Sequence, residues 1–506
     1  NIHGIILCIV SFGILFLLTF LYNFMQIKLA NPIELLRGTS VGEREPKTKI
    51  LMTIIGVVCL ATAYYIAITT ENPLNVLTLF FVAVLLVVIG TFAIFTAGRI
   101  ALLKLLRNNK KFYYNKRHFM AVSGMLYRMK QNAAGLASIC ILSTMVLVVI
   151  STTVSMYVGI QDELMARYPN DVCVTVDYNS VIDKSSEIEK AIFDEIDSAE
   201  VKNKKAFSYL SVFVGQKGDN FTTDKEHLSF QNSYLFYILS KDDFIKRDNS
   251  FKDKIGNISK GEAVVVLNKK YDKKDIKIFG KSYKVNKNFE HIYDDNLYVL
   301  STLNGLGYII LDNNESVQEL YDVQEKMLGK GANYYTNEIR FDFKSANKKQ
   351  KIAAYKKVDN AVKRYFKDNK NDKKEISSYW VESRQENEKN FYLLYGGLFF
   401  LGIFLGTMFL MVTVMIIFYK QITEGYDDRE RYQILEKVGM SNREVKDTIK
   451  SQIRIVFVLP IFAAAIHVTA AFPMVYRLLQ MLNLNNEKLF AGCLAVTIIV
   501  FAVIYY

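Results

Sequence analysis

The sequence predicts a polytopic α-helical membrane protein with one large mixed α/β domain inserted between the fourth and fifth membrane helices of this chain. Seven apolar runs are each long enough to cross a bilayer core, which takes about 20 helical residues. A polar segment, residues 161–388, separates the fourth run from the fifth. The chain carries a net charge of +13, and the excess lies wholly outside that segment.

The apolar runs define the membrane part of the chain. They lie at residues 2–22, 50–68, 74–96, 137–157, 391–418, 453–472 and 489–506. The first run lacks the basic flank and small-residue cleavage site of a signal peptide, so we expect a membrane helix there. Because both chain ends fall in apolar runs, we interpret the sequence as a fragment with further helices upstream.

The distribution of charge predicts the orientation. Residues 1–160 carry 14 Lys and Arg against 4 Asp and Glu, residues 389–506 carry 11 against 8, and residues 161–388 are balanced. Since Lys and Arg accumulate in cytoplasmic loops, we expect loops 31–49 and 99–130 inside and residues 161–388 outside the cell. Topology and attraction to anionic membrane lipid explain the basic surplus, so no nucleic-acid partner is expected.

These boundaries divide the chain into three parts. Residues 1–160 hold four membrane helices and two basic cytoplasmic loops, residues 161–388 form the extracellular domain, and residues 389–506 hold three membrane helices. A cytoplasmic segment, residues 427–450, connects the fifth helix to the sixth.

The extracellular part has the pattern of a mixed α/β domain. Apolar bursts rich in β-branched residues predict strands at 172–176, 263–267, 277–279, 283–285, 297–300 and 308–311. Capping-box spacings, Ser186 with Glu189 and Ser316 with Glu319, predict two helices, the first reaching about residue 199.

A third, basic helix is predicted at residues 347–367 of this domain. Its cations offer a binding site for an anionic headgroup or a pyrophosphate, and the alternative is an ordinary solvated face. The candidate ligand-binding residues are Lys348, Lys351, Lys356, Lys363 and Arg364.

The domain enters and leaves the membrane through segments that we interpret as helical. Residues 161–167 extend the fourth apolar run until Pro169, and residues 379–389 lead without Gly or Pro into the fifth run. We therefore expect a paired helical stalk that couples the domain to two membrane helices.

Residue types that carry catalysis or bind metals are sparse. Four of the five cysteines fall within apolar runs and only Cys173 belongs to the inserted domain, so no disulfide is expected there. The five histidines are scattered, and no Cys/His pair has zinc spacing. A G-x-x-x-x-G-K-[ST] phosphate loop is absent from the sequence, so we expect no catalytic residues, no metal and no bound ATP in this chain.

Four residues inside the apolar runs have structural interpretations of their own. Gly402 and Gly406 form a G-x-x-x-G pattern, for which we expect close helix packing. Pro460 predicts a kink in the sixth helix. His467 lies in the same run, and we expect it to be solvated near the outer membrane surface.

The segment between the fifth and sixth runs is charged and amphipathic. Tyr432, Leu435 and Val438 form an apolar stripe, Gly439 suits a helix C-cap, and Ser441 suits the next N-cap. The pattern predicts a helix, a glycine turn and a second helix held flat at the cytoplasmic membrane surface. Periodicity alone leaves open whether this segment transmits force or only anchors a loop.

This segment, DDRERYQILEKVGMSNREVKDTI, resembles the coupling segment of FtsX-like ABC transporter permeases, and most closely that of the BceB-type branch. Residues 31–38, NPIELLRG, and residues 123–147 resemble the same branch. Those permeases have ten helices with one external domain before the last three, so the resemblance matches this chain to the fourth through tenth. The residues that it assigns to the ATPase contact are Arg429, Glu430, Arg431, Tyr432, Ile434, Leu435, Val438, Gly439, Met440 and Ser441.

The resemblance implies a plasma-membrane permease subunit of a Gram-positive bacterium that gives resistance to peptide antibiotics acting on cell-wall lipid intermediates. ATP and Mg would be bound by a separate ABC ATPase subunit, in two copies. The external domain would bind the peptide or its lipid pyrophosphate complex and signal to a membrane histidine kinase. The family's first coupling segment would precede Asn1.

Two other functions stay open at this stage. One is a mechanotransmitting or lipoprotein-releasing permease of the FtsX, MacB or LolC type, although these usually have four helices with the domain after the first. The other is a membrane receptor that signals without transport, for which a fused signalling domain is expected.

Overall fold

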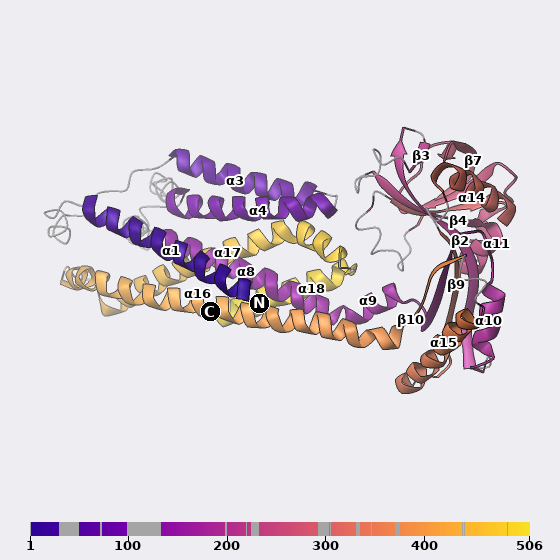
Figure 1. Ribbon diagram of the computed structural model, residues 1–506. Coiled ribbons are helices and arrows are strands. Elements are labelled where there is room, and N and C mark those ends of the chain that lie inside the picture. The colour runs from indigo at the N-terminus through magenta and orange to yellow at the C-terminus, as the bar shows by residue number, and fades with distance from the viewer. Residues whose placement is uncertain are drawn as a thin grey trace. The chain divides into compact units, whose positions relative to one another are not determined.

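The computed structural model describes residues 2–29, 50–70, 73–98, 133–197, 200–218, 220–223, 232–291, 303, 305–329, 334–345, 347–369, 375–437, 439, 441–482 and 484–505. The chain divides into two compact units. In the first, the described part is a single apolar helix, α1 (Ile2–Leu29). The second holds all the other described elements and is considered by itself below (Figure 1).

The seven predicted membrane helices are confirmed among the described residues. Each apolar run forms a helix because a chain in a bilayer can satisfy its backbone N–H and C=O groups only within the segment itself. The helices are α1, α3 (Ile50–Thr69), α4 (Pro73–Ala93), which continues as the π-helix η1 (Ile94–Gly98), α8 (Ala133–Val158), α16 (Arg384–Lys437), α17 (Asn442–Gln480) and α18 (Glu487–Tyr505).

Helix α8 packs against α16, α17 and α18 through an apolar cluster that includes Leu136, Ile139 and Leu147. The predicted packing glycines lie on this contact. A Cβ atom on Gly402 would be 2.2 Å from Thr153 Oγ1, and one on Gly406 would be 2.7 Å from Ile150 Cγ1. Only glycine therefore allows α16 to approach α8 this closely.

Helix α17 is also tied to α3 by a polar contact. The guanidinium of Arg477 donates hydrogen bonds to carbonyl oxygens at the end of α3, with Nη1 2.6 Å from Thr70 O and 3.2 Å from Ile68 O. The last carbonyls of a helix have no partner within it, so this arginine completes the C-terminus of α3.

The inserted domain, residues 171–383, is built on one sheet of 10 described strands, and this sheet domain confirms the predicted mixed α/β architecture. The strand order is β10-β1-β9-β2-β3-β6-β7-β5-β8-β4, and β2 also pairs with β4. The strands are β1 (Val172–Tyr178), β2 (Val201–Lys217), β3 (Asn220–Thr222), β4 (Ser233–Ser240), β5 (Glu262–Leu267), β6 (Asp275–Ile278), β7 (Lys281–Glu290), β8 (Gly305–Leu311), β9 (Tyr334–Phe343) and β10 (Ile376–Ser383).

The long strand β2 joins two parts of this sheet. Its residues 201–211 pair with β9, and its residues 210–217 pair with β4 and then with β3. Because β4 also pairs with β8, the pairings from β3 through β6, β7, β5 and β8 return to β2 and close a ring of strands. The ring encloses an apolar cluster that includes Phe236, Val265 and Ile309.

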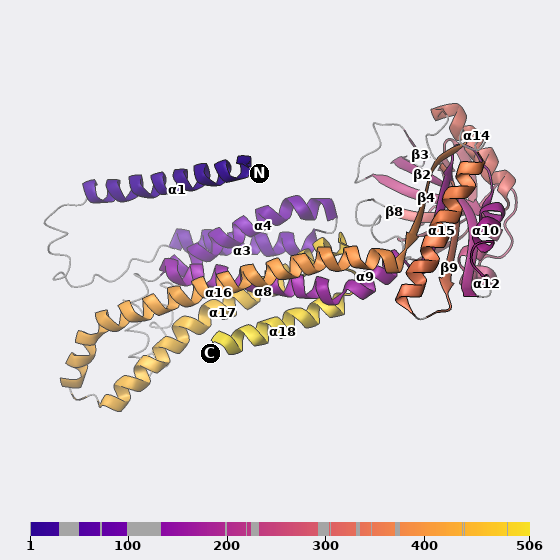
Figure 2. The ribbon, with the colours of Figure 1, turned by 60° about the horizontal axis from the view of Figure 1, so that its bottom comes forward.

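Helices cover one face of each part. Helices α10 (Ser185–Phe193) and α15 (Lys348–Asp368) pack on β1 and β9 through a cluster that includes Val174, Ile188 and Val362 (Figure 2). Helix α14 (Asn314–Leu328) packs on the ring, and α11 (Lys241–Arg247), the 3-10 helix η4 (Asn249–Phe251) and α12 (Lys252–Ile255) cover its β4, β5 and β8 side.

Several predicted elements need correction. Residues 379–383 are not helical: they belong to β10, and α16 begins at Arg384. Ser186 does not cap a helix. Helix α10 begins one residue earlier, where Asp183 Oδ1 accepts the Ser185 backbone N–H at 3.0 Å, and it ends at Phe193. The predicted strand at 297–300 lies outside the described residues.

The helix predicted near Ser316 is present but has a different cap. Asn313 is the N-cap residue of α14, and its Oδ1 accepts the Ser316 backbone N–H at 2.9 Å. Glu319 instead forms ion pairs with Lys260 and Lys281. Strands β2, β3, β4, β9 and β10 were not predicted.

Candidate functional site

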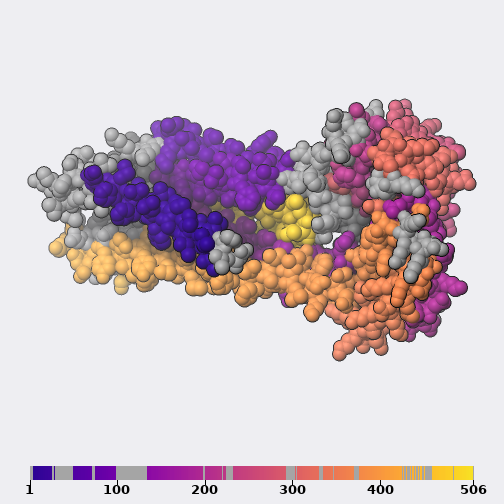
Figure 3. Space-filling view, in the orientation of Figure 1, coloured from indigo at the N-terminus to yellow at the C-terminus, as the bar shows by residue number. Residues whose placement is uncertain are grey.

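One continuous helix connects the sheet domain to the opposite end of the membrane bundle. Helix α16 runs for 54 residues from Arg384, next to β10, to Lys437 (Figure 2). At 1.5 Å per residue, this corresponds to about 80 Å, far more than the ~30 Å of a bilayer core. In the space-filling view its orange surface runs without interruption into the sheet domain (Figure 3). The two ends of this helix therefore lie at the sheet domain and at the turn before α17.

The end of α16 at the sheet domain is held by Asp171, at the start of β1. Its carboxylate is 2% exposed and accepts hydrogen bonds from Lys351 Nζ at 2.7 Å, Gln385 Nε2 at 2.6 Å and the Phe343 backbone N–H at 3.0 Å. Burial raises the pKa of Asp171, but the hydrogen bonds from Lys351 and Gln385 outweigh burial and lower its pKa overall. One ionised carboxylate thus joins α15, β9 and α16 to the beginning of the domain.

Arg384, the first residue of α16, binds the segment that enters the domain. Its guanidinium donates to the carbonyl oxygens of Tyr168, at 2.6 Å, and Pro169, and its backbone N–H donates to Asp171 O at 3.1 Å. The entering and leaving chains are therefore fastened to each other. We call these contacts of residues 168–171 with residues 384 and 385 the domain junction.

Below the junction the two chains continue side by side as the predicted stalk. Helix α9 (Ile160–Arg167) follows α8 and contacts α16. Gln161 Nε2 donates to the Tyr392 hydroxyl at 3.0 Å, and the Tyr168 and Phe391 rings meet edge to face. A paired stalk of α9 and α16 is present, although β10 replaces the helix predicted for its upper part.

A cavity of about 200 Å³ opens beside the junction on the sheet face opposite α10 and α15. Trp380, on β10, is 42% exposed there. Glu338 is buried, forms an ion pair with Arg340 and accepts a hydrogen bond from the Tyr209 hydroxyl at 3.0 Å. Burial raises the pKa of the Cys173 thiol, so this cysteine stays protonated at neutral pH.

The predicted ligand-binding helix, α15, contacts the junction itself. Lys351 is the donor to Asp171, and Lys348 Nζ lies 2.6 Å from Glu388 on α16. Lys363 pairs with Asp359, and Arg364 pairs with Glu195, whereas Lys356 is exposed. The structure thus gives two of the five predicted residues a part in holding α16. The sequence pattern showed the charge of this helix but not the acids opposite it.

The predicted coupling segment lies where α16 meets α17. Helix α16 extends to Lys437 without a break, so the segment does not form the separate helix that the sequence predicts. Gly439 has a φ of +111°, a left-handed conformation that favours glycine, and Asn442 begins α17. Arg429 and Ser441 are exposed, and the side chain of Ile434 is 60% exposed, unusual for an isoleucine.

Other residues of that segment are described only in part. Val438 and Met440 lie outside the described residues. The helix includes Glu430, Arg431, Tyr432 and Leu435, but their side chains also lie outside what the structure describes. The segment therefore contributes an exposed glycine turn between two helices, within reach of a partner protein.

The expectation that His467 is solvated is wrong, since its side chain is only 5% exposed. Its Nδ1 lies 2.5 Å from the Tyr64 hydroxyl of α3, and its Nε2 lies 3.1 Å from Thr91 Oγ1 of α4. Thr91 donates its own proton to Val87 O at 2.6 Å, so it accepts from Nε2 and leaves Tyr64 to donate to Nδ1. His467 thus joins three membrane helices. The only sequence signal for this contact was that Tyr64 and Thr91 are polar residues within two other apolar runs.

Comparison with known proteins identifies relatives along almost the whole chain. No family model matches it. The chain is 24% identical to the ABC transporter permease protein YxdM of Bacillus subtilis (strain 168), over 97% of this chain and 72% of that protein. It is 21% identical to the uncharacterized ABC transporter permease YvcS of the same organism, over 99% of this chain and 74% of that protein.

Two bacitracin export permeases are also related. The chain is 21% identical to the protein BceB of Bacillus subtilis (strain 168), over 92% of this chain and 69% of that protein. The similarity spans the membrane helices and the inserted domain together, which agrees with the multi-pass architecture described above. The homologues of this chain are therefore ABC transporter permeases, the bacitracin export permease BceB among them.

Proposed function

We propose that the chain is the membrane subunit of an ATP-driven transporter that protects the cell against peptide antibiotics acting on cell-wall lipid intermediates. In this proposal the sheet domain lies outside the cell and binds the peptide or its complex with a lipid pyrophosphate. A separate ABC ATPase, in two copies with ATP and Mg, binds at the turn between α16 and α17. A membrane histidine kinase receives the state of the sheet domain as a signal.

The observation that carries this proposal is the continuity of α16 between the domain junction and the Gly439 turn. An ATPase that moves the turn would move a helix whose other end is fixed to Asp171 through Gln385 and to the entering chain through Arg384. Such coupling requires only that the ATPase and the ligand each bind one position of this helix more tightly than another. The relation to bacitracin export permeases supports a peptide antibiotic as the ligand.

The Gly439→Val substitution tests the proposed coupling. A β-branched residue is strained at a φ of +111°, so the variant should reshape the turn while leaving the membrane helices intact. We expect it to reach the membrane normally but to lose peptide resistance and kinase-dependent signalling together. Resistance is measured as the bacitracin concentration that inhibits growth, in a host that expresses the partner ATPase and lacks its own transporter.

Gly425→Val is the matched control. Gly425 lies within α16, a Cβ atom added to it would have no described heavy atom within 4 Å, and valine is no worse than glycine in a helix. This control should retain full resistance. Wild-type resistance in Gly439→Val cells would contradict a coupling role for the turn.

A further inference from the structure

A buried carboxylate on α9 has no hydrogen-bond partner within the described part of the protein. Glu163 is 1% exposed, and neither of its carboxylate oxygens forms a hydrogen bond. Its neighbours along the helix, Ile160 and Leu164, belong to an apolar cluster with Tyr395 and Phe490. A buried carboxylate without a donor is strongly disfavoured, so this position calls for a positively charged or N–H-bearing group from outside the chain.

Glu163 lines a cavity of about 620 Å³ between α9 and the turn that joins α17 to α18. Three described donors in or near this cavity already have acceptors. Asn486 Nδ2 donates to Asp162 at 3.0 Å, the Tyr476 hydroxyl to Asn485 O at 2.8 Å, and the Tyr395 hydroxyl to Leu482 O at 3.2 Å. None of these three hydrogen bonds is made to Glu163, although the nearby Tyr395 hydroxyl interacts with its carboxylate.

The turn is fixed against the stalk, so the cavity has a firm wall. A Cβ atom on Gly159 would lie 2.5 Å from Leu484 Cδ1 and 2.9 Å from Ser155 O. Glycine at this position allows the turn to approach α8 and α9 closely. The cavity is therefore part of the fold rather than an open gap between separate elements.

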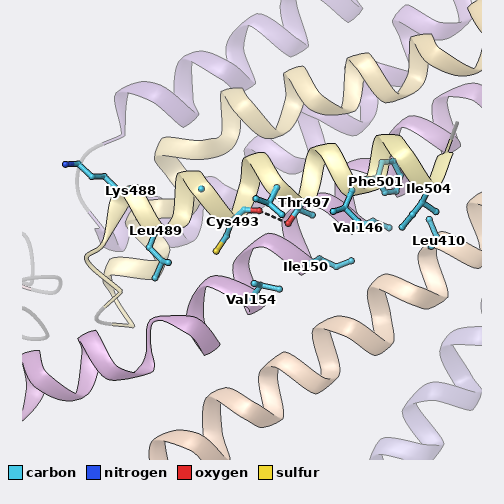
Figure 4. Close-up of a pocket in the computed structure, with 13 residues that line it drawn as sticks. Val146, Ile150, Val154, Leu410, Lys488, Leu489, Cys493, Thr497, Phe501 and Ile504 are labelled. Atoms are coloured by element: carbon cyan, nitrogen blue, oxygen red, sulfur yellow. Dashed lines mark hydrogen bonds between the residues drawn. The ribbon is translucent and has the colours of Figure 1, made fainter.

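An apolar groove of about 500 Å³ (Figure 4) shares the lining residue Lys488 with this cavity. Val146, Ile150 and Val154 of α8 line one wall, and α18 lines the other from Leu489 to Ile504. The groove follows two membrane-spanning helices, whereas the cavity lies beyond the end of the α8 span at Val158. Lys488 stands at the boundary between the two.

We propose that the cavity and the groove form one binding site for a phospholipid whose headgroup carries a primary ammonium. The ammonium binds the Glu163 carboxylate, Lys488 neutralises the phosphate, and an acyl chain lies in the groove along α18. The lipid thereby connects α9 of the stalk with α8 and α18. This role is independent of the antibiotic and goes beyond the proposed resistance function.

The charges around the site favour this ligand. Asp162 and Glu487 also line the cavity and add negative charge to it, whereas Lys488 lines both the cavity and the groove. The pKa of Glu163 is raised to about 7, chiefly by burial; the nearby Tyr395 hydroxyl partly offsets this rise, and the charge of Asp162 adds to it. A bound ammonium would return this carboxylate to its ionised form. Across the described residues no three His, Cys, Asp or Glu side chains are grouped to hold a metal ion.

Lipid binding to the purified full chain tests the proposal. Native mass spectrometry would compare dioleoyl phosphatidylethanolamine, phosphatidylglycerol and phosphatidylcholine, added singly to the delipidated protein in detergent. We expect phosphatidylethanolamine to bind about tenfold more tightly than the other two, because only its headgroup can donate N–H groups to Glu163. Glu163→Gln should abolish this preference, since a neutral amide does not attract an ammonium.

Two variants separate the headgroup from the acyl chain. Val154→Trp fills the groove and should weaken the binding of all three lipids alike. The control is Glu189→Gln, because Glu189 pairs with Lys204 in the sheet domain, and this variant should not change lipid binding. Equal affinities of the wild-type chain for the three lipids would overturn the proposal. So would Glu163-dependent binding of a soluble lysine-rich peptide that phosphatidylethanolamine cannot displace, because the occupant would then be a peptide.

Discussion

At the scale of single residues, the attachment of the sheet domain depends on Asp171. This carboxylate joins the start of β1 to α15 through Lys351 and to α16 through Gln385. A buried ion pair of this kind adds little to the free energy of unfolding, but removing one partner destabilises the fold because the other charge is left buried and unpaired. The residue therefore acts chiefly in fixing the position of α16 relative to the domain.

Asp171→Asn should destabilise the domain junction. The amide leaves the Lys351 ammonium, which is only 18% exposed, without a counter-ion, a loss on the order of 3 kcal/mol. We expect a lower Tm and faster proteolysis near residues 167–171 in the purified chain. Lys356→Ala, at an exposed position of the same helix, is the control and should behave as wild type. An unchanged Tm in Asp171→Asn would show that the junction is held by other contacts.

The pH dependence of Asp171 has a definite sign. Because its pKa is lowered in the folded chain, its contribution to stability is present above the unfolded pKa of about 3.9 and is lost as the pH falls through the folded value. The junction is thus intact at neutral pH and weakens only in acid.

Glu163 has the opposite dependence. Its pKa is raised to about 7, so the folded chain loses stability as the pH rises from the unfolded value of about 4.3 to above 7, by roughly 3 kcal/mol in all. In lipid-free detergent, Glu163→Gln should therefore raise the Tm at pH 8.5 and leave it nearly unchanged at pH 5. An equal change at both pH values would mean that ionisation of Glu163 is not the cause.

At the scale of elements, the sequence predicts what local composition decides. All seven membrane helices follow from runs of apolar residues, and the helix at Lys348–Asp368 follows from its own periodicity. Strand β9 was missed because Asn337 and Glu338 are polar yet buried, each with a partner from another strand. Such burial depends on residues more than 100 positions away, which no local pattern contains.

Distant partners also explain the other differences. Strand β10 lacks Gly and Pro and was interpreted as helix, but it pairs with β1, where Cys173 is opposite Glu382. His467 was expected to be solvated because its hydrogen-bond partner Tyr64 lies 403 positions earlier. Asp171 was not predicted as a site at all, since nothing near it in sequence distinguishes it from other surface acids.

The packing of α16 on α8 gives a test at this scale. Gly402→Val would place side-chain atoms against Thr153, whose Oγ1 lies 2.2 Å from the added Cβ position, so the helices must separate at a cost of about 1–3 kcal/mol. We expect a lower Tm and reduced yield of folded protein. Gly397→Val is matched, because it is also in α16 but no heavy atom lies within 4 Å of its Cβ position. Similar losses in both variants would indicate a general effect of valine in this helix.

At the scale of the whole molecule, the proposal requires that the sheet domain and the α16–α17 turn lie on opposite sides of the membrane. Lys356 and Lys437 are both exposed, one in α15 and one at the end of α16. Each is replaced singly by cysteine in a chain that lacks the five native cysteines, and the two variants should differ in their reaction with a maleimide in intact cells. An impermeant maleimide should label Lys356→Cys directly and Lys437→Cys only after permeabilisation. Labelling of both in intact cells would refute this topology.

The cavity beside the junction has a practical consequence. Trp380, which lines it, is the only tryptophan of the chain and lies four residues before Arg384. Indole emission is sensitive to local polarity, and Arg167, Glu382 and Arg340 line the same cavity. The unlabelled protein therefore carries an optical probe at the point where helix α16 meets the sheet domain. Ligand-induced or nucleotide-induced rearrangement of that point can be followed in real time, without attached dyes.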